Sequence, residues 1–205
     1  AKLSKELRKV SAKAAPDFLF AGESPYDLQL RDYHLSYIRI DQSHIPLHRY
    51  IDPYTEIMVA VTGFNDRDMI NLCLLYRYIM SYEPFNFRGR LSDFPLTIGY
   101  GKKVDMLRKR YREYLWDAEF CDILGAKVTV GDKPYFLYSV FKQKALGKRA
   151  IVVANQNENM EIEANVTIEN PRGALIFATP EDQEPRKTRG TVVIPPRSVI
   201  VLMET

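Results

Sequence analysis

The sequence contains no apolar run that approaches the roughly 20 residues of a membrane-spanning helix, so we expect no membrane partner. It also lacks a phosphate-binding loop, a dinucleotide fingerprint and a Gly-x-Ser-x-Gly elbow. It also has no large excess of one charge, because it contains 29 basic and 26 acidic residues. These absences argue against nucleotide-dependent chemistry, against serine-hydrolase chemistry and against a nucleic-acid partner, which would require a basic patch.

Cysteine and histidine are both scarce. The two cysteines, Cys73 and Cys121, lie in apolar helical contexts without metal-type spacing. This predicts free thiols and favours a reducing compartment such as the cytoplasm. The three histidines, His34, His44 and His48, fall close together, but no cysteine joins them. We therefore expect no metal site and no cofactor.

The apolar content, 46% of 205 residues, suffices for a packed core in one large or two small domains. Up to residue 125, strand-like runs alternate with helical ones, which is typical of βαβ units around a parallel sheet. We expect strands over 18–20, 37–40, 56–62 and 81–87, and helices over 3–14, 65–80 and 102–122. These are about four units, roughly half of a closed (β/α) barrel. Residues 1–125 are therefore predicted to be the C-terminal part of such a barrel.

From residue 126 onward every element has the pattern of a strand. Residues 161–169 alternate apolar and polar side chains, which is the period of a half-buried antiparallel strand. We expect a mobile loop over the charged stretch 180–190. Further strands are predicted over 126–130, 134–140, 149–155, 174–178, 191–194 and 198–203. Seven short strands with turn residues between them predict an all-β domain over 126–205, an antiparallel β-sandwich.

Acidic residues follow the apolar runs of the first segment. In a (β/α) barrel, the residues at the C-terminal ends of the strands carry the chemistry. Glu23 follows Gly22 and suits either general acid/base chemistry or capping of the next loop. Asp41 shares a strand face with Arg39, so the two form either an ion pair or part of a ligand site. Asp66 either contacts a substrate or caps the helix that follows it.

Carboxylates in such positions are what glycosidic cleavage requires. One acid protonates the leaving oxygen, and a second carboxylate attacks the sugar or activates water. Aromatic side chains are expected near the same edge, Tyr37 and Phe87 among them, and these can stack on sugar rings or simply pack in the core. With Glu23, Asp41 and Asp66 as catalytic candidates, the predicted substrate-binding residues are Tyr26, Arg39, His48, Arg49, Phe64, Asn65 and Glu83.

The segment Pro16–Glu23 resembles the strand of α-amylase-like glycoside hydrolases that ends in a catalytic glutamate. The later order is similar too: Ile40-Asp41, then Gly63–Asp66 opening a helix, then an all-β domain whose closing hairpin resembles Val192–Leu202. Related uncharacterised bacterial barrel proteins share this order. The resemblance implies that Glu23 is the general acid/base. The chain departs from the family pattern in lacking the Asn-His-Asp triplet, and the strand with the aspartate nucleophile would lie upstream of Ala1.

Three interpretations stay open. In the first, the chain is part of a glycoside hydrolase that acts on an oligosaccharide or a glycoside. In the second, it is a non-catalytic carbohydrate-binding or structural module. In the third, it is a half-barrel whose exposed sheet edges are covered by a missing N-terminal barrel half or by a second copy of the chain.

Overall fold

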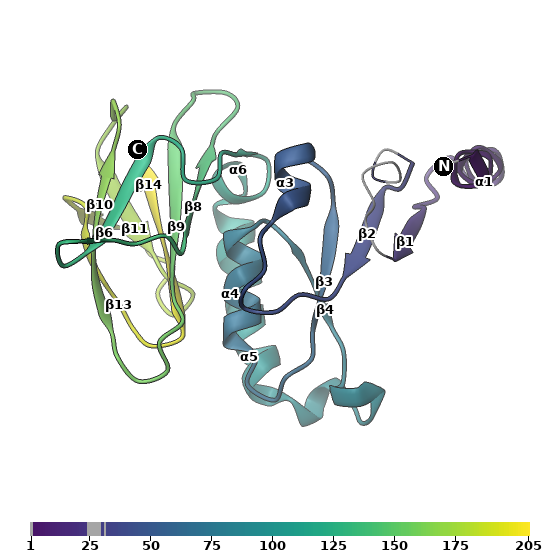
Figure 1. Ribbon diagram of the computed structural model, residues 1–205, viewed down its shortest axis with the longest axis horizontal. Helices are drawn as coiled ribbons and strands as arrows, with labels where there is room; N and C mark the ends of the chain where they lie inside the picture. Colours follow the sequence, from purple (N-terminus) through teal and green to yellow (C-terminus); the bar gives the residue numbers. More distant parts are fainter. Residues whose placement is uncertain (1, 24–29, 31) are drawn as a thin grey trace.

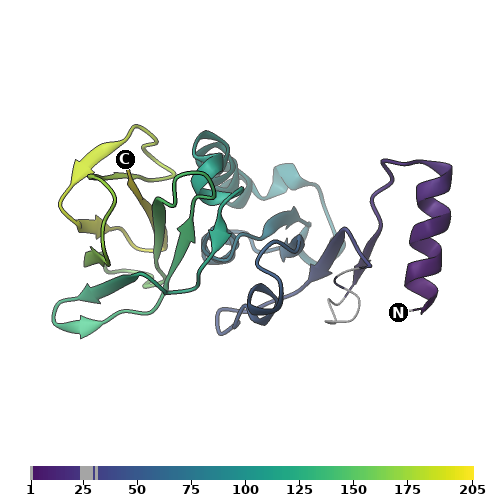
Figure 2. The same cartoon turned by 90° about the horizontal axis from the view of Figure 1, so that it is seen from above.

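The computed structural model describes residues 2–23, 30 and 32–205, which form an elongated molecule (Figure 1). A parallel sheet, a layer of helices and two antiparallel sheets follow one another along its length. The view from above shows the same order, with α1 at the far N-terminal end (Figure 2). The four parallel strands agree with the predicted half-barrel, and the two antiparallel sheets agree with the predicted all-β domain. A closed barrel and a β-sandwich stay predictions.

The parallel sheet has the strand order β1-β2-β3-β4. Its strands are β1 (Ala21–Glu23), β2 (Leu35–Ile38), β3 (Ile57–Val61) and β4 (Ile79–Tyr82). The predicted burial of 18–20 is wrong, because β1 starts only at Ala21 and the side chains of Phe18 and Leu19 are 51% and 69% exposed. Burial on both faces requires neighbours on both sides, and the described residues place no strand beyond β1.

The helices are α1 (Lys2–Ala14), α3 (Leu47–Ile51), α4 (Arg67–Leu75), α5 (Pro95–Arg110) and α6 (Arg112–Leu115), with 3₁₀ turns η1 (Phe85–Phe87) and η2 (Leu91–Asp93). Along the chain, α1 precedes β1, α3 and α4 connect strands of this sheet, and α5 and α6 follow β4. Helix α4 ends five residues earlier than predicted, because Arg77 turns the chain with a positive φ of 55°. Helix α5 begins earlier than predicted, at a proline that suits the first helical position.

Helix α1 confirms the helix predicted over 3–14, but its apolar stripe is not covered by the described residues. Leu3, Leu7 and Val10 are 72%, 45% and 64% exposed, whereas Ser4 is buried and lies 3.5 Å from the hydroxyl of Tyr33. The amphipathic pattern therefore predicts the helix correctly, but the described residues leave its apolar face exposed.

Two antiparallel sheets follow, with the orders β13-β10-β6-β7 and β12-β11-β14-β9-β8-β5. The strands are β5 (Glu119–Phe120), β6 (Ala126–Val130), β7 (Lys133–Pro134), β8 (Tyr138–Lys142), β9 (Arg149–Asn155), β10 (Ile162–Ile168), β11 (Leu175–Ala178), β12 (Arg186–Thr188), β13 (Thr191–Ile194) and β14 (Ser198–Glu204). The stretch predicted as a mobile loop contains β12, and Glu184 within it forms a 2.7 Å ion pair with Arg110 of α5. Strand β5 lies before residue 125, where the sequence predicts the boundary between the two domains. The boundary stays a prediction.

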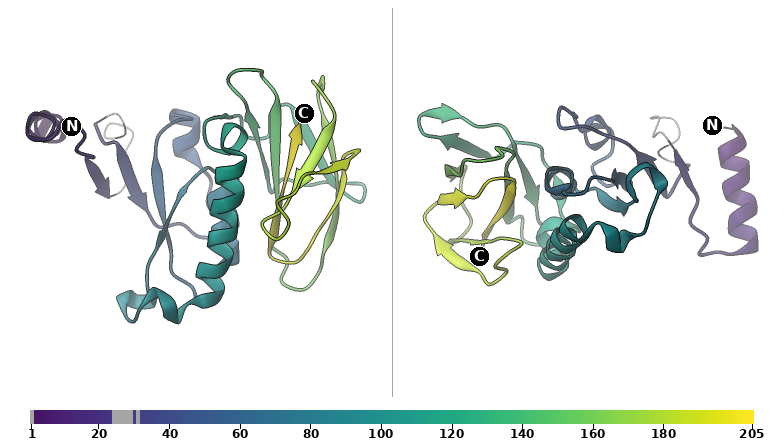
Figure 3. Two further views of the ribbon diagram at one scale, coloured as in Figure 1. Left: turned by 180° about the vertical axis from the view of Figure 1, so that it is seen from behind. Right: turned by 90° about the horizontal axis from the view of Figure 1, so that it is seen from below.

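The six-stranded sheet is buried on both faces. One face packs against α4 and α5, and the other packs against the four-stranded sheet, so the two cores lie back to back (Figure 3). Strand β14 is accordingly apolar and buried along most of its length, whereas β10 alternates buried and more exposed positions. Helices α4 and α5 thus lie between the parallel sheet and the six-stranded sheet, and no described helix covers the other face of the parallel sheet.

Candidate active site

The two faces of the parallel sheet differ because of its register. Glu23 lies level with Tyr37, Tyr37 with Met58, and Met58 with Ile79. Side chains alternate along a strand, so Arg39 and Glu83 project to the same side as these residues. The opposite face carries Ile57, Val59 and Val61, which are almost fully buried against the helices. The register alone therefore gathers polar side chains on the face that the helices do not cover.

This open face contains a hollow of about 760 Å³. Its walls come from all four parallel strands, from the residues that directly follow β2 and β4, and from η1, and only β3 contributes through a residue near its start, Met58. The lining residues are Ala21, Gly22, Glu23, Tyr37, Ile38, Arg39, Met58, Ser81, Glu83 and Phe87. Three of the predicted site residues, Glu23, Arg39 and Glu83, are thus brought together here. A concave site with a few polar groups at the C-terminal edge of a parallel sheet is a typical place for ligand binding.

Glu23 is the last residue of β1 and is exposed. The residue before it, Gly22, has no room for a side chain, because a Cβ there would lie 2.5 Å from the ring of Tyr33. Tyr33 in turn packs on Phe20, with 5.1 Å between the ring centroids. The glycine therefore lets the Tyr33 ring pack directly against β1 at the residue before Glu23.

Arg39, Glu83 and Tyr37 form a polar cluster on the open face. Arg39 Nη2 lies 3.4 Å from Glu83 Oε2, and Arg39 Nε donates to the hydroxyl of Tyr37 over 3.2 Å. Ser81 donates to the other oxygen of Glu83 over 3.3 Å. The amide of Glu83 donates to the carbonyl of Val61, which continues the β3–β4 ladder by one residue. Both side chains of the ion pair are therefore positioned by regular strand structure.

Tyr37 responds electrostatically to this cluster. Partial burial and a hydrogen bond to Glu83 raise the pKa of the Tyr37 hydroxyl, and the nearby Arg39 guanidinium only partly offsets them. The phenol therefore stays protonated at neutral pH and can donate a hydrogen bond.

Phe87 closes the hollow on the side of η1. Its ring is 70% exposed, and the Arg39 guanidinium carbon lies 5.1 Å from the ring centroid. Phe87 and the preceding Asn86 both adopt positive φ angles, 57° and 54°. For a bulky residue such a conformation is an outlier that the surroundings must hold in place. The turn thus holds an aromatic ring at the mouth of the hollow.

Asp66 does not line the hollow. Its Oδ2 accepts hydrogen bonds from the amides of Thr62 and Gly63, both over 2.9 Å. Its own amide donates to Thr97, whose hydroxyl donates to the carbonyl of Gly63. The side chain forms no capping bond with α4 either. Asp66 thus occupies the N-cap position of α4, but its carboxylate stabilises the turn after β3 instead of capping the helix.

Asp41 also lies outside the hollow, and the ion pair that Arg39 forms among the described residues is with Glu83. Its Oδ1 accepts from the amide and the hydroxyl of Ser43, over 2.8 and 2.6 Å. These two hydrogen bonds lower the pKa of the Asp41 carboxyl. The carboxylate stabilises the turn that follows β2, which is a structural role that its position after the strand could not reveal.

Arg49 belongs to the interior. It is 1% exposed, and its guanidinium donates to the carbonyls of Thr55, Tyr76 and Arg77. Burial, together with the nearby Arg77 charge, lowers the pKa of Arg49 to about 10. Because its donors are used on the backbone, Arg49 presents no surface to a ligand, and we leave it out of the proposed site.

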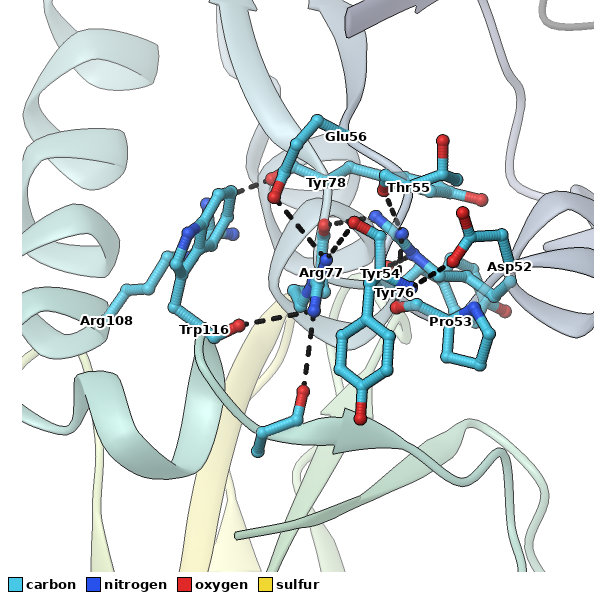
Figure 4. A network of polar contacts seen from close by, with 12 residues as sticks. Asp52, Pro53, Tyr54, Thr55, Glu56, Tyr76, Arg77, Tyr78, Arg108 and Trp116 are labelled. Atoms are coloured by element: carbon cyan, nitrogen blue, oxygen red, sulfur yellow. Dashed lines mark hydrogen bonds and ion pairs between the residues drawn. The ribbon is translucent and has the colours of Figure 1, made fainter. Parts of the chain in front are cut away.

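Arg77 belongs to the same interior network. It lies between the rings of Tyr54 and Trp116 and pairs with Glu56 over 3.6 Å (Figure 4). Its Nη2 donates to the carbonyl of Tyr54 over 2.9 Å. The network ties the start of β3 to the chain between α4 and β4.

The remaining predicted residues are scattered. Phe64 is 61% exposed and stacks on Phe94, with ring centroids 4.9 Å apart. The carbonyl of Asn65 accepts a 2.6 Å hydrogen bond from Arg197. His48 lies on α3 and is not among the residues that line the hollow. Tyr26 lies outside the described residues.

Sequence reasoning missed Ser81, and it included Tyr37 and Phe87 only among the aromatic residues expected near this edge. The signal for Ser81 was available, because it lies two residues before Glu83 and so shares a strand face with it. The turn with positive φ angles that positions Phe87 could not be predicted from the sequence. Over residues 2–23, 30 and 32–205, no group of three or more His, Cys, Asp or Glu side chains could hold a metal ion. Nor does any helix in these ranges have both the length and the apolar character needed to cross a membrane.

Comparisons with known proteins agree with the fold. No protein-family model and no curated protein matches the chain. Among solved structures, the α-amylase of Geobacillus thermoleovorans in complex with acarbose is 12% identical with a TM-score of 0.56, and the match covers 100% of this chain and 57% of that one. An Anoxybacillus α-amylase is 13% identical with a TM-score of 0.54, over 98% of this chain and 55% of that one.

A third similar structure is the cyclic α-maltosyl-(1→6)-maltose hydrolase of Arthrobacter globiformis. It is 12% identical with a TM-score of 0.57, over 100% of this chain and 53% of that one. The chain thus spans about half the length of each of these glycoside hydrolases. At such identities the likeness shows a shared fold, and it supports at this level the resemblance that the sequence motifs indicated.

Proposed function

We propose that this chain is part of a glycoside hydrolase, and that the hollow on the open face of the parallel sheet is part of its substrate site. The observation that carries the proposal is the convergence of Glu23, Arg39 and Glu83 on one hollow at the C-terminal ends of parallel strands. Structural neighbours that are glycoside hydrolases add support at the level of the fold.

In this proposal Glu23 is the general acid/base. It would protonate the glycosidic oxygen and, in a retaining reaction, later deprotonate the attacking water. Its exposed carboxylate at the end of β1 is open to a ligand in the hollow. Glu83 suits binding better than catalysis, because its two oxygens already accept from Arg39 and Ser81.

The second carboxylate of the reaction is proposed to come from outside the described residues. Asp41 and Asp66 use oxygen atoms on Ser43, Thr62 and Gly63 and do not line the hollow. We therefore no longer assign Asp41 and Asp66 to catalysis and propose structural roles for both.

Substitution of Glu23 by glutamine in the full-length protein tests this role. With a panel of aryl glycosides and oligosaccharides as substrates, we expect kcat/KM of Glu23→Gln to fall by about 10²–10⁴, the usual contribution of general acid/base catalysis. The matched control is Glu163→Gln on β10, an exposed glutamate in the four-stranded sheet, which should leave kcat/KM unchanged. Activity of Glu23→Gln within about tenfold of the unsubstituted protein would contradict the assignment.

One observation favours a second candidate, a non-catalytic carbohydrate-binding module. Only one of the three predicted catalytic carboxylates, Glu23, lines the hollow. If the full-length protein binds oligosaccharides but releases no product from any of them, the module interpretation replaces the hydrolase.

We further propose that the outer edge of β1 and the apolar stripe of α1 are covered either by other strands of the same protein or by a second copy of the chain. Unpaired edges and exposed apolar stripes rarely stay uncovered in solution. A mass of 23.8 kDa for this chain in solution would contradict coverage by a second copy.

A further inference from the structure

We propose that Phe87, Arg39 and Glu83 form a subsite for one neutral sugar ring. The ring of Phe87 would pack against the C–H face of the sugar, and the ion pair would hold two adjacent hydroxyl groups. The inference rests on the proposed function, because it places a sugar in the same hollow, and it adds the class of sugar and the residues that select it.

The first observation is the conformation of η1. Two consecutive residues, Asn86 and Phe87, lie in the left-handed region, and the turn is closed by the amide of Phe87 donating to the carbonyl of Pro84 over 2.8 Å. A phenylalanine held in this region while its ring is 70% exposed contributes little to a core. The strained turn has one evident effect, which is to place an aromatic face at the rim of the hollow.

The second observation is the pairing of a donor and an acceptor beside that ring. Arg39 offers N–H donors from a side chain that is 58% exposed, and Glu83 offers carboxylate oxygens from one that is 16% exposed. Adjacent hydroxyls of a sugar each donate and accept, so a guanidinium and a carboxylate 3.4 Å apart can bind two of them together. The aromatic face nearby complements the apolar face of a sugar ring, which has no charge of its own.

The third observation is the formal charge of the hollow. Its ten lining residues include two carboxylates, Glu23 and Glu83, and one guanidinium, Arg39, so the sum is 1 − 2 = −1. Arg39 is already paired with Glu83 and does not provide an unopposed positive charge. An acidic sugar such as a uronate would therefore be repelled, whereas a neutral sugar would not be.

Calorimetric titration of the full-length protein with Glu23 intact, at a low temperature and over times in which no product forms, tests the subsite, because Glu23→Gln would remove one of the two carboxylate charges of the hollow. The probes are maltotriose, cellotriose and trigalacturonate. We expect at least one neutral trisaccharide to bind at least tenfold more tightly than trigalacturonate. The substitution Phe87→Ala should weaken that binding by at least tenfold, and Phe87→Trp should retain it, because the tryptophan restores an aromatic face.

The matched control is Phe136→Ala. Phe136 is also 70% exposed but lies in the region of the antiparallel sheets, away from the hollow. Equal affinities of Phe87→Ala and Phe136→Ala would overturn the subsite, and so would preferred binding of trigalacturonate or binding of none of the three sugars. The proposed function fails on a different measurement, the hydrolysis rate of Glu23→Gln, so the two failures can be told apart.

Discussion

The two faces of the parallel sheet are built from alternate residues of the same strands, yet they have opposite characters. Toward the helices, β3 presents Ile57, Val59 and Val61, which are almost inaccessible to solvent. On the open side lie the side chains of Arg39 and Glu83, which directly follow β2 and β4. The alternation of side chains along a strand thus supplies both the buried core and the lining of the hollow. A shift of register by one residue would exchange the side chains on the two faces.

Arg49 and Arg39 show the same contrast between a buried and an exposed environment. Arg49 is buried, and its guanidinium donates to backbone carbonyls, whereas Arg39 is exposed and meets a carboxylate and an aromatic ring. The residue type is the same, but the surroundings make one a part of the core and the other a part of the candidate site. Substitution of a core residue should therefore lower the free energy of unfolding more than substitution of a residue that lines the hollow.

The largest effect on stability is expected from the helix layer. Leu107 of α5 is fully buried in the core that joins the parallel sheet to the six-stranded sheet. Leu107→Ala should lower the free energy of unfolding by about 2–5 kcal/mol, through lost apolar contacts and the cavity left behind. Leu96→Ala, in the same helix but 62% exposed, should change it by less than about 0.5 kcal/mol. Urea unfolding measures both, and similar losses would contradict the placement of α5.

A somewhat smaller effect is expected at the buried arginine. Arg49→Met leaves the carbonyls of Thr55, Tyr76 and Arg77 without their donor, and it should lower the free energy of unfolding by about 2–3 kcal/mol. Arg39→Met removes an exposed ion pair and should cost below about 1 kcal/mol. The same arginine-to-methionine change thus compares the two environments directly. A greater loss for Arg39→Met than for Arg49→Met would reverse our assignment.

The smallest effect is a dependence of stability on pH. Burial lowers the pKa of His44, whose Nε2 lies 2.9 Å from the hydroxyl of Tyr78, and the nearby His48 lowers it further. As the pH falls through the ordinary histidine pKa of about 6.5, the unfolded chain therefore binds a proton more readily than native His44 does. Stability should therefore fall as the pH drops from about 7 to about 5. In His44→Gln this slope should be reduced, and an unchanged slope in urea unfolding at several pH values would exclude His44 as its source.

Much of the C-terminal half could be predicted from local patterns. Strands β6, β9 and β13 begin and end at the predicted residues, because alternation and turn residues mark them in the sequence. The parallel strands were placed less well: β1 begins after the apolar run that predicted it, and β4 begins two residues before its predicted start. Parallel strands pair with distant segments, and a short apolar run does not say where that pairing begins.

The sequence by itself determined the alternation of strands and helices, the order of the parallel strands along the chain, and the presence of acidic residues after them. Only the tertiary structure decided which of these carboxylates line the hollow. Asp41 and Asp66 are held by nearby amides and a serine hydroxyl, while Glu23 and Glu83 share a hollow with Arg39. The physical reason is that position along a strand fixes the face of a side chain, but the hydrogen-bond donors within its reach depend on how loops and neighbouring strands fold around it.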